Sequence, residues 1–283
     1  ERYKCRFVAQ GVRQVPGLDY TEKCAPKPAV ASTRVLPALA TMNDMELHHI
    51  DVEQAFIRAR IDDEIFIGSP EKYQSFPGAV GKLNKSLYGV VQASRNWNIL
   101  LTEILTNIGF EQAMADPCVL RKMEGTVLGV LLVVHVDDIL VASKYAATMK
   151  QFKKDLATKF SIKDLREAKY NMGGHIECER SKQSPTMDQH VHLKTIIDRF
   201  HISKDSPEPA SSTCHSRTAY GQNTTDAGWQ NPVPGAVGVL MQASTMTRPY
   251  RGDAVHNVAK LCEKPGQIHW KAVIKILQYL RGT

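Results

Sequence analysis

Two adjacent aspartates, Asp137 and Asp138, are the residues of this sequence with the clearest chemical potential. They interrupt an apolar run over residues 127–141, and this pattern predicts two strands that turn at an acidic pair. Adjacent carboxylates repel each other unless a cation neutralises them, so a divalent metal is their natural partner. Aspartates also favour turns for local hydrogen-bonding reasons, and the spacing by itself does not decide between a metal site and an ordinary turn.

A metal site of this kind needs a third carboxylate, and Asp51 is the best candidate. It lies near the end of a strand-like run over residues 47–52, and Phe56 follows five residues later. Asp51, Asp137 and Asp138 are together predicted to hold two Mg²⁺ ions, with Mn²⁺ as an alternative, roughly 3.5 to 4 Å apart. Such an arrangement stabilises the attacking and leaving oxygens in phosphoryl or nucleotidyl transfer.

The elements that must position these acids follow from the spacing of apolar residues. Apolar residues at i, i+3, i+4 and i+7 predict helices over residues 94–109, 149–160, 193–200 and 270–280. Short apolar or β-branched runs predict strands over residues 6–9, 47–52, 64–67, 127–134 and 139–141. Residues 203–234 are rich in Ser, Thr, Pro and Asn, which predicts a mobile connector that divides the chain. Helices and strands alternate irregularly, and this favours an α+β fold.

The composition fits a globular protein and suggests a polyanionic partner. The 283 residues include 36 Lys plus Arg and 29 Asp plus Glu, so the net charge is 36 − 29 = +7. Hydrophobic residues make up 43%, which allows a sizeable core and excludes disordered and collagen-like chains. No apolar run approaches the roughly 18 residues that a membrane span needs. The six cysteines form no C-x-x-C pair, which argues against a zinc site or disulfide scaffold and indicates a reducing compartment.

Several short motifs, in order along nearly the whole chain, resemble the reverse transcriptase of copia-type LTR retrotransposons. They are KCRFVAQG at residues 4–11, GLDY at 17–20, HIDV at 49–52, AF at 55–56, KSLYG at 85–89, QA at 92–93, VDD at 136–138, Thr-Arg-Pro at 247–249, HWKA at 269–272 and YLRGT at 279–283. Coincidence is a poor explanation for so many motifs at the spacing of one family.

The resemblance implies a right-hand polymerase with an antiparallel palm sheet. It places the fingers and palm in residues 1–170, and the end of the palm, a linker and a thumb-like helical region in residues 171–283. Both ends of the chain are expected to be cuts from a longer Pol polyprotein, with integrase upstream and RNase H downstream. The implied partners are an RNA template, a DNA primer or RNA–DNA hybrid, and dNTPs. The implied location is a cytoplasmic virus-like particle, with the cDNA later reaching the nucleus.

The resemblance also implies a role for each acid. Asp51, Asp137 and Asp138 would form the catalytic, metal-binding site of the palm, to which the backbone of Val52 would add a ligand. Metals bound there would activate the primer 3′-hydroxyl and neutralise the triphosphate as pyrophosphate leaves.

Five further residues resemble substrate contacts of the family. Phe56 resembles the steric gate that packs beneath the incoming sugar and excludes a ribose 2′-hydroxyl. Lys4 and Arg6 resemble the fingers cations that grip the incoming triphosphate. Gly89 and Gln92 fall in the segment that supports the template and the nucleotide pocket, where Gly89 permits close backbone approach.

Departures from the family pattern support a second hypothesis. His135 stands where the family usually has Tyr, and we expect it to stack or hydrogen-bond near the primer with a smaller ring. Val91 replaces a usual Lys, Pro37 is expected to kink or stop a helix, and Tyr250 replaces a usual Asp. The alternative function is therefore a diverged, catalytically silent remnant that keeps the fold and binds nucleic acid. A metal-dependent nuclease would use the same acids but would not account for Phe56.

Overall fold

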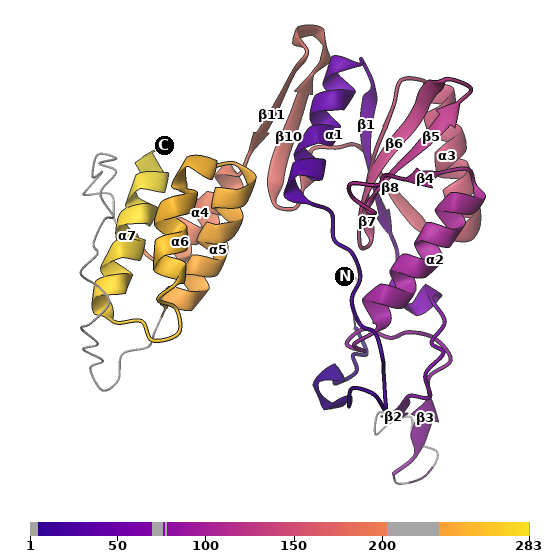
Figure 1. Ribbon diagram of the computed structural model, residues 1–283, viewed down its shortest axis with the longest axis horizontal. Helices are drawn as coiled ribbons and strands as arrows, with labels where there is room; N and C mark the ends of the chain where they lie inside the picture. Colours follow the sequence, from indigo (N-terminus) through magenta and orange to yellow (C-terminus); the bar gives the residue numbers. More distant parts are fainter. Residues whose placement is uncertain (1–4, 70–75, 77, 203–231, 283) are drawn as a thin grey trace. The chain divides into compact units, whose positions relative to one another are not determined.

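The computed structural model describes residues 5–69, 76, 78–202 and 232–282 (Figure 1). The chain divides into two compact units. The first contains Glu1–Ala168 and Cys178–Pro185, and the second contains Lys169–Glu177 and Thr186–Thr283. Helices and antiparallel strands both contribute, in agreement with the predicted α+β class. Among the helices of the described ranges, none combines the length and the apolar character that crossing a membrane requires.

A six-stranded antiparallel sheet organises the first unit (Figure 1). Its strand order is β4-β5-β6-β7-β1-β8, so β1 lies between two strands that are distant from it in sequence. The strands are β1 (Glu46–Val52), β4 (Glu111–Gln112), β5 (Val119–Glu124), β6 (Val127–His135), β7 (Asp138–Ser143) and β8 (Ile162–Glu167). The structure confirms the three strands predicted around the acids, which are β1, β6 and β7.

Two helices contribute the main core against one face of this sheet. They are α2 (Ala93–Asn107) and α3 (Ala146–Lys159), and they confirm the helices predicted over residues 94–109 and 149–160. Ile50 and Ile139 pair across β1 and β7 and are fully buried against this layer. The rings of Phe110 and Phe152 lie 5.2 Å apart in the same core. Burial on this face therefore determines which strand residues point away from it.

A third helix, α1 (Val30–Met42), contacts β1, β6 and β7. It continues through Pro37, so the expected stop at this residue is wrong. Proline donates no hydrogen bond to the preceding turn. The burial of Leu36, Pro37 and Ala40 offsets that loss and keeps the helix in one piece.

The first turn of α1 is capped by a residue far away in sequence. Asp116, which is 7% exposed, accepts hydrogen bonds from the Ala29 N–H at 2.9 Å and the Ser32 hydroxyl at 2.5 Å through Oδ2. Its other oxygen accepts a bond from the Cys118 N–H at 2.9 Å. Burial would raise the pKa of Asp116, but these hydrogen bonds outweigh it and lower the pKa. Asp116 therefore ties the start of α1 to the segment before β5.

The segment before α1 differs from its prediction. Residues 6–9 form no strand, because the segment makes a single backbone bond, from the Ala9 N–H to the Tyr88 carbonyl at 2.8 Å, instead of a ladder. The strand predicted over residues 64–67 corresponds to β2 (Phe66–Gly68), which pairs with β3 (Val80–Lys82) in a separate small sheet.

The second unit contains four helices in its described part. They are α4 (His190–Arg199), α5 (Val233–Met246), α6 (Gly252–Ala259) and α7 (Gln267–Gly282), and they share a core that includes Leu193, Leu240, Val255 and Leu277. α4 and α7 confirm the helices predicted over residues 193–200 and 270–280. Before them in sequence, β9 (Tyr170–Asn171), β10 (Gly174–Glu179) and β11 (Ser184–Asp188) form a three-stranded sheet, of which residues 178–185 are assigned to the first unit.

The connector predicted over residues 203–234 ends differently from its prediction. Residues 203–231 lie outside the described residues. At its end the prediction is wrong, because α5 begins at Val233 and includes Pro234 in its first turn. Proline is tolerated there, because backbone N–H groups in the first turn of a helix make no hydrogen bond within the helix.

We predict that Asp116→Ala lowers the free energy of unfolding by about 1 to 3 kcal/mol, because it removes a cap and leaves the buried Cys118 N–H unpaired. Since the folded state lowers the pKa of Asp116, its stabilisation is present above the ordinary Asp pKa. The stabilisation is lost as the pH falls through the lowered value. Urea unfolding across this range, with the exposed Asp62→Ala as matched control, measures both effects. Equal losses in the two variants would contradict the capping role.

Candidate active site

Four ionisable residues form one row across four neighbouring strands. His135 on β6 pairs with Asp138 on β7. Asp138 in turn pairs with Asp51 on β1, and Asp51 pairs with Lys163 on β8. Residues that pair directly across a sheet point to the same face. The structure therefore brings Asp51 and Asp138 side by side, with one cationic or titratable neighbour at each end of the row.

The turn between β6 and β7 places Asp137 next to this row. The Val52 N–H donates a hydrogen bond to the Asp137 carbonyl at 2.9 Å. Val136 has a φ of +60°, which is strained for a β-branched residue. The buried Trp97 of α2 donates its indole N–H to the Val136 carbonyl at 2.7 Å. A core helix thus holds the turn in its unusual conformation.

The three acids repel one another in this arrangement. Burial raises the pKa of Asp51, and the negative charges of Asp137 and Asp138 raise it further. His49 and Lys163 act in the opposite direction but do not cancel these effects. A nearby cation would therefore stabilise the charged form of Asp51.

The donor types fit a hard divalent cation, because Mg²⁺ prefers carboxylate oxygens. In the described ranges, however, no three His, Cys, Asp or Glu side chains are gathered closely enough to hold a metal ion. The fold therefore supplies the donors and their neighbouring strand positions without a closed ligand cage. The predicted contribution of the Val52 backbone, which would come from its carbonyl oxygen, stays a prediction.

His49 is a neighbour of the acids to which the sequence motif assigned no role. Its Nε2 lies 2.8 Å from Oδ1 of Asp138. The alternation of side chains along a strand could have identified His49 from the sequence. It lies two residues before Asp51, so the two side chains face the same side of β1.

Phe56 begins a short 3₁₀ helix, Phe56–Arg58, just after β1. Its ring lies 5.0 Å from the ring of Tyr88, and the guanidinium of Arg6 lies 5.2 Å above the same Tyr88 ring. The structure thus joins two predicted substrate contacts through Tyr88, a residue whose role the sequence did not reveal. Lys4 lies outside the described residues.

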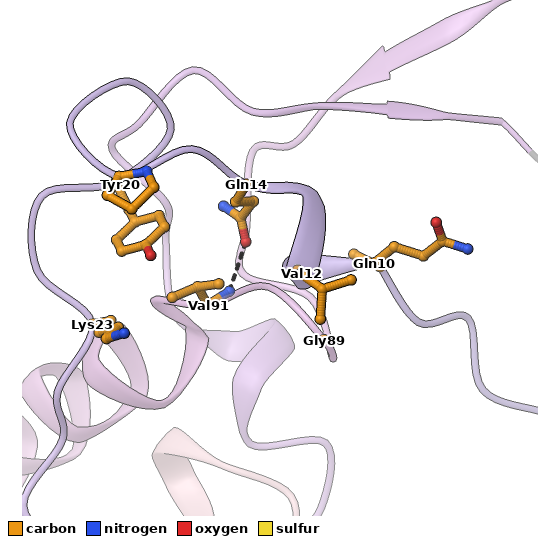
Figure 2. A pocket seen from close by; sticks show the side chains of 10 residues that line it. Gln10, Val12, Gln14, Tyr20, Lys23, Gly89 and Val91 are labelled. Carbon is orange, nitrogen blue, oxygen red and sulfur yellow. Dashed lines mark hydrogen bonds between the residues drawn. The ribbon is translucent and has the colours of Figure 1, made fainter.

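Gly89 does permit close backbone approach, and the approaching backbone belongs to the same chain. With a φ of +87°, a Cβ there would meet the Ala9 carbonyl oxygen at 2.1 Å. The crossing borders a cavity of about 590 Å³, in which Gln14 accepts a 2.8 Å hydrogen bond from the Val91 N–H (Figure 2). Its lining residues are Ala9, Gln10, Gly11, Val12, Gln14, Pro16, Tyr20, Lys23, Gly89 and Val91. The three carboxylates are not among them.

Gln92 bonds to the lining residue Gln14 and is 1% exposed. Its amide nitrogen donates to Asp63 at 2.8 Å and to the Asp19 carbonyl at 3.0 Å, while its oxygen accepts a bond from Gln14 at 3.1 Å. These bonds tie the N-terminal segment to the start of α2. Any contribution of Gln92 to substrate binding would therefore act through the shape of this segment.

Comparison with known proteins adds independent information. A model of the family described as "Reverse transcriptase (RNA-dependent DNA polymerase)" matches residues 1–210. The chain is 33% identical over 289 residues to the Retrovirus-related Pol polyprotein from transposon TNT 1-94 of Nicotiana tabacum. It is 29% and 30% identical to the corresponding polyproteins from transposons RE2 and RE1 of Arabidopsis thaliana. Each match covers 100% of this chain but only 22%, 19% and 19% of the relatives' lengths.

We predict that Asp51→Asn raises the free energy of unfolding in the absence of divalent cations. Like charges directly opposite each other on paired strands cost roughly 0.2 to 1 kcal/mol, and the substitution removes one of them. Because the fold raises the pKa of Asp51, this advantage is present at neutral pH. It shrinks as the pH falls through the raised value. Thermal unfolding in EDTA, with Asp62→Asn as the exposed control, measures the difference. A destabilised Asp51→Asn protein would contradict the repulsion.

Proposed function

The chain belongs to the reverse transcriptase (RNA-dependent DNA polymerase) family, and we propose that it catalyses RNA-directed DNA synthesis at the row of acids on β1 and β7. The observation that carries this proposal is the register of these strands, which sets Asp51 opposite Asp138 with Asp137 in the adjoining turn. In this proposal a dNTP reacts with a primer 3′-hydroxyl on an RNA template, and pyrophosphate leaves.

The acids have a defined task in this reaction. Asp51, Asp137 and Asp138 would hold two Mg²⁺ or Mn²⁺ ions, which supply charge neutralisation for the attacking and leaving oxygens. Burial of Asp51 and the negative charges of Asp137 and Asp138 together raise its pKa, and the closeness of these charges supports the assignment. Lys163 at the end of the row is exposed and would add positive charge near the leaving pyrophosphate.

The neighbouring residues would select and hold the nucleotide. Phe56 would support the deoxyribose and exclude a 2′-hydroxyl, and its contact with Tyr88 fixes its ring. Arg6 would grip the triphosphate together with Lys4, which suits a guanidinium fork. His135 pairs with Asp138 and would contact the primer end. The segment around Gly89 and Gln92 would support the template strand.

We assign the elements of the two units to the parts of a right-hand polymerase. The six-stranded sheet with α2 and α3 would be the palm, and β2, β3 and the segment that crosses Gly89 would be the fingers. The helices of the second unit would form the thumb. The chain spans about a fifth of the relatives' lengths. We therefore also propose that it works within a Pol polyprotein with integrase and RNase H, in a cytoplasmic particle.

Two observations favour a second candidate. The described side chains contain no closed group of three metal ligands, and His135 replaces the usual Tyr of the motif. A silent family member would bind RNA and DNA in a salt-sensitive manner without incorporating nucleotides.

A primer-extension assay separates the two candidates. We predict extension of a DNA primer on an RNA template with Mg²⁺ or Mn²⁺, and a loss of at least about 100-fold in rate for Asp51→Asn or Asp137→Asn, because charge stabilisation of the transition state is removed. Asp62→Asn serves as the control. Robust binding without extension would support the silent candidate, and extension that survives both substitutions would disprove the assignment of the acids.

The role of Phe56 gives a separate prediction. Phe56→Val should raise the efficiency of ribonucleotide relative to deoxyribonucleotide incorporation by roughly 10-fold or more, since discrimination by steric fit at one pocket amounts to 1 to 3 kcal/mol. Single-nucleotide kcat/KM values for dNTP and rNTP measure it. The buried Phe110→Leu, in the core against α3, is the control for general loosening. Unchanged discrimination in Phe56→Val would show that Phe56 is only a core aromatic.

A further inference from the structure

Two consecutive histidines on β1 point to opposite faces of the sheet. His48 contacts Lys153 on α3 at 2.5 Å and Glu46 at 3.4 Å, away from the acids. His49 faces the same side as Asp51, and its Nε2 lies 2.8 Å from Oδ1 of Asp138. Adjacent residues of one type are therefore placed in different environments by the strand period alone.

Asp138 has two neighbours on β1 that act on it in opposite ways. Asp51 is directly opposite and repels it, whereas His49, one pleat further along the strand, donates a hydrogen bond to it. The His49 side chain is 13% exposed and that of Asp138 is 39% exposed. A donor with little exposed surface thus holds a carboxylate that is more exposed.

The hydrogen bond uses only one oxygen of the carboxylate. Among the hydrogen bonds and ion pairs of the described residues, none engages Oδ2 of Asp138. Fixing Oδ1 restricts the rotation of the side chain and leaves Oδ2 available on the face that also carries Asp51. Without the bond, repulsion by Asp51 would turn the carboxylate away.

We propose that His49 is a positioning residue, which orients Asp138 so that its free oxygen serves the acidic site. The inference deepens the proposed polymerase function and rests on it. His49 acts through Asp138 and takes no part in bond formation.

Four variants test the proposal. His49→Leu removes the donor but keeps an apolar side chain of similar bulk. His49→Gln restores a donor, because its amide nitrogen extends about as far along the chain as Nε2 of histidine. His49→Asn is polar but ends one bond short. His48→Gln makes the same chemical change on the opposite face and is the matched control.

Single-nucleotide incorporation and Mn²⁺ binding by calorimetry are the two readouts. We expect His49→Leu and His49→Asn to lower kcat by about 10- to 100-fold with the KM for dNTP little changed, and to weaken Mn²⁺ binding by about 10-fold. His49→Gln should recover most of both losses, and His48→Gln should match the wild type. In an Asp138→Asn background, the effect of His49→Leu on Mn²⁺ binding should disappear.

Three results would overturn the proposal: wild-type behaviour of His49→Leu in both readouts, recovery by Asn as complete as by Gln, or an undiminished effect in the Asp138→Asn background. If His49→Leu does not fold, the comparison of Gln with Asn decides the question. A wild-type protein that incorporates no nucleotide would disprove the polymerase function, and Mn²⁺ binding by the same variants would still test the role of His49.

Discussion

The register between β1 and β7 is the constraint on which the rest of the structure depends. The fully buried pair Ile50 and Ile139 locks it, because both side chains must enter the core that α2 and α3 supply. A shift by one residue would carry Asp51 into that core and expose its apolar neighbours. Hydrophobic burial on one face therefore holds two like charges together on the other.

Two further hydrogen bonds stabilise the close placement of the acids. Trp97 reaches from the core to hold the strained carbonyl of Val136, and His49 holds one oxygen of Asp138. Both partners come from rigid elements, a helix and a central strand. The repulsion between the acids is thus offset by favourable packing elsewhere in the fold, as is common at functional sites.

The N-terminal segment that contains Arg6 and Ala9 is held in place without strand pairing. In its described part, from residue 5 onward, it joins no strand ladder and is held by a close backbone crossing at Gly89 and by the buried amide of Gln92. A glycine at positive φ lets the backbones at Ala9 and Gly89 approach, and Arg6 in the same segment lies over the Tyr88 ring. Sequence periodicity mistook this segment for a strand, since an extended, apolar stretch has the same pattern whether or not it is paired.

Sequence alone determined the hairpin around Asp137, the helices α2, α3, α4 and α7, and the family, because these follow from local periodicity and from ordered motifs. It also predicted the identity of the three acids. Tertiary structure decided what lies beside them: that His49 and Lys163 flank the acids, that Asp116 caps α1, and that α1 survives Pro37. These contacts join residues on different elements, and only the packing of those elements brings them within hydrogen-bonding or electrostatic range.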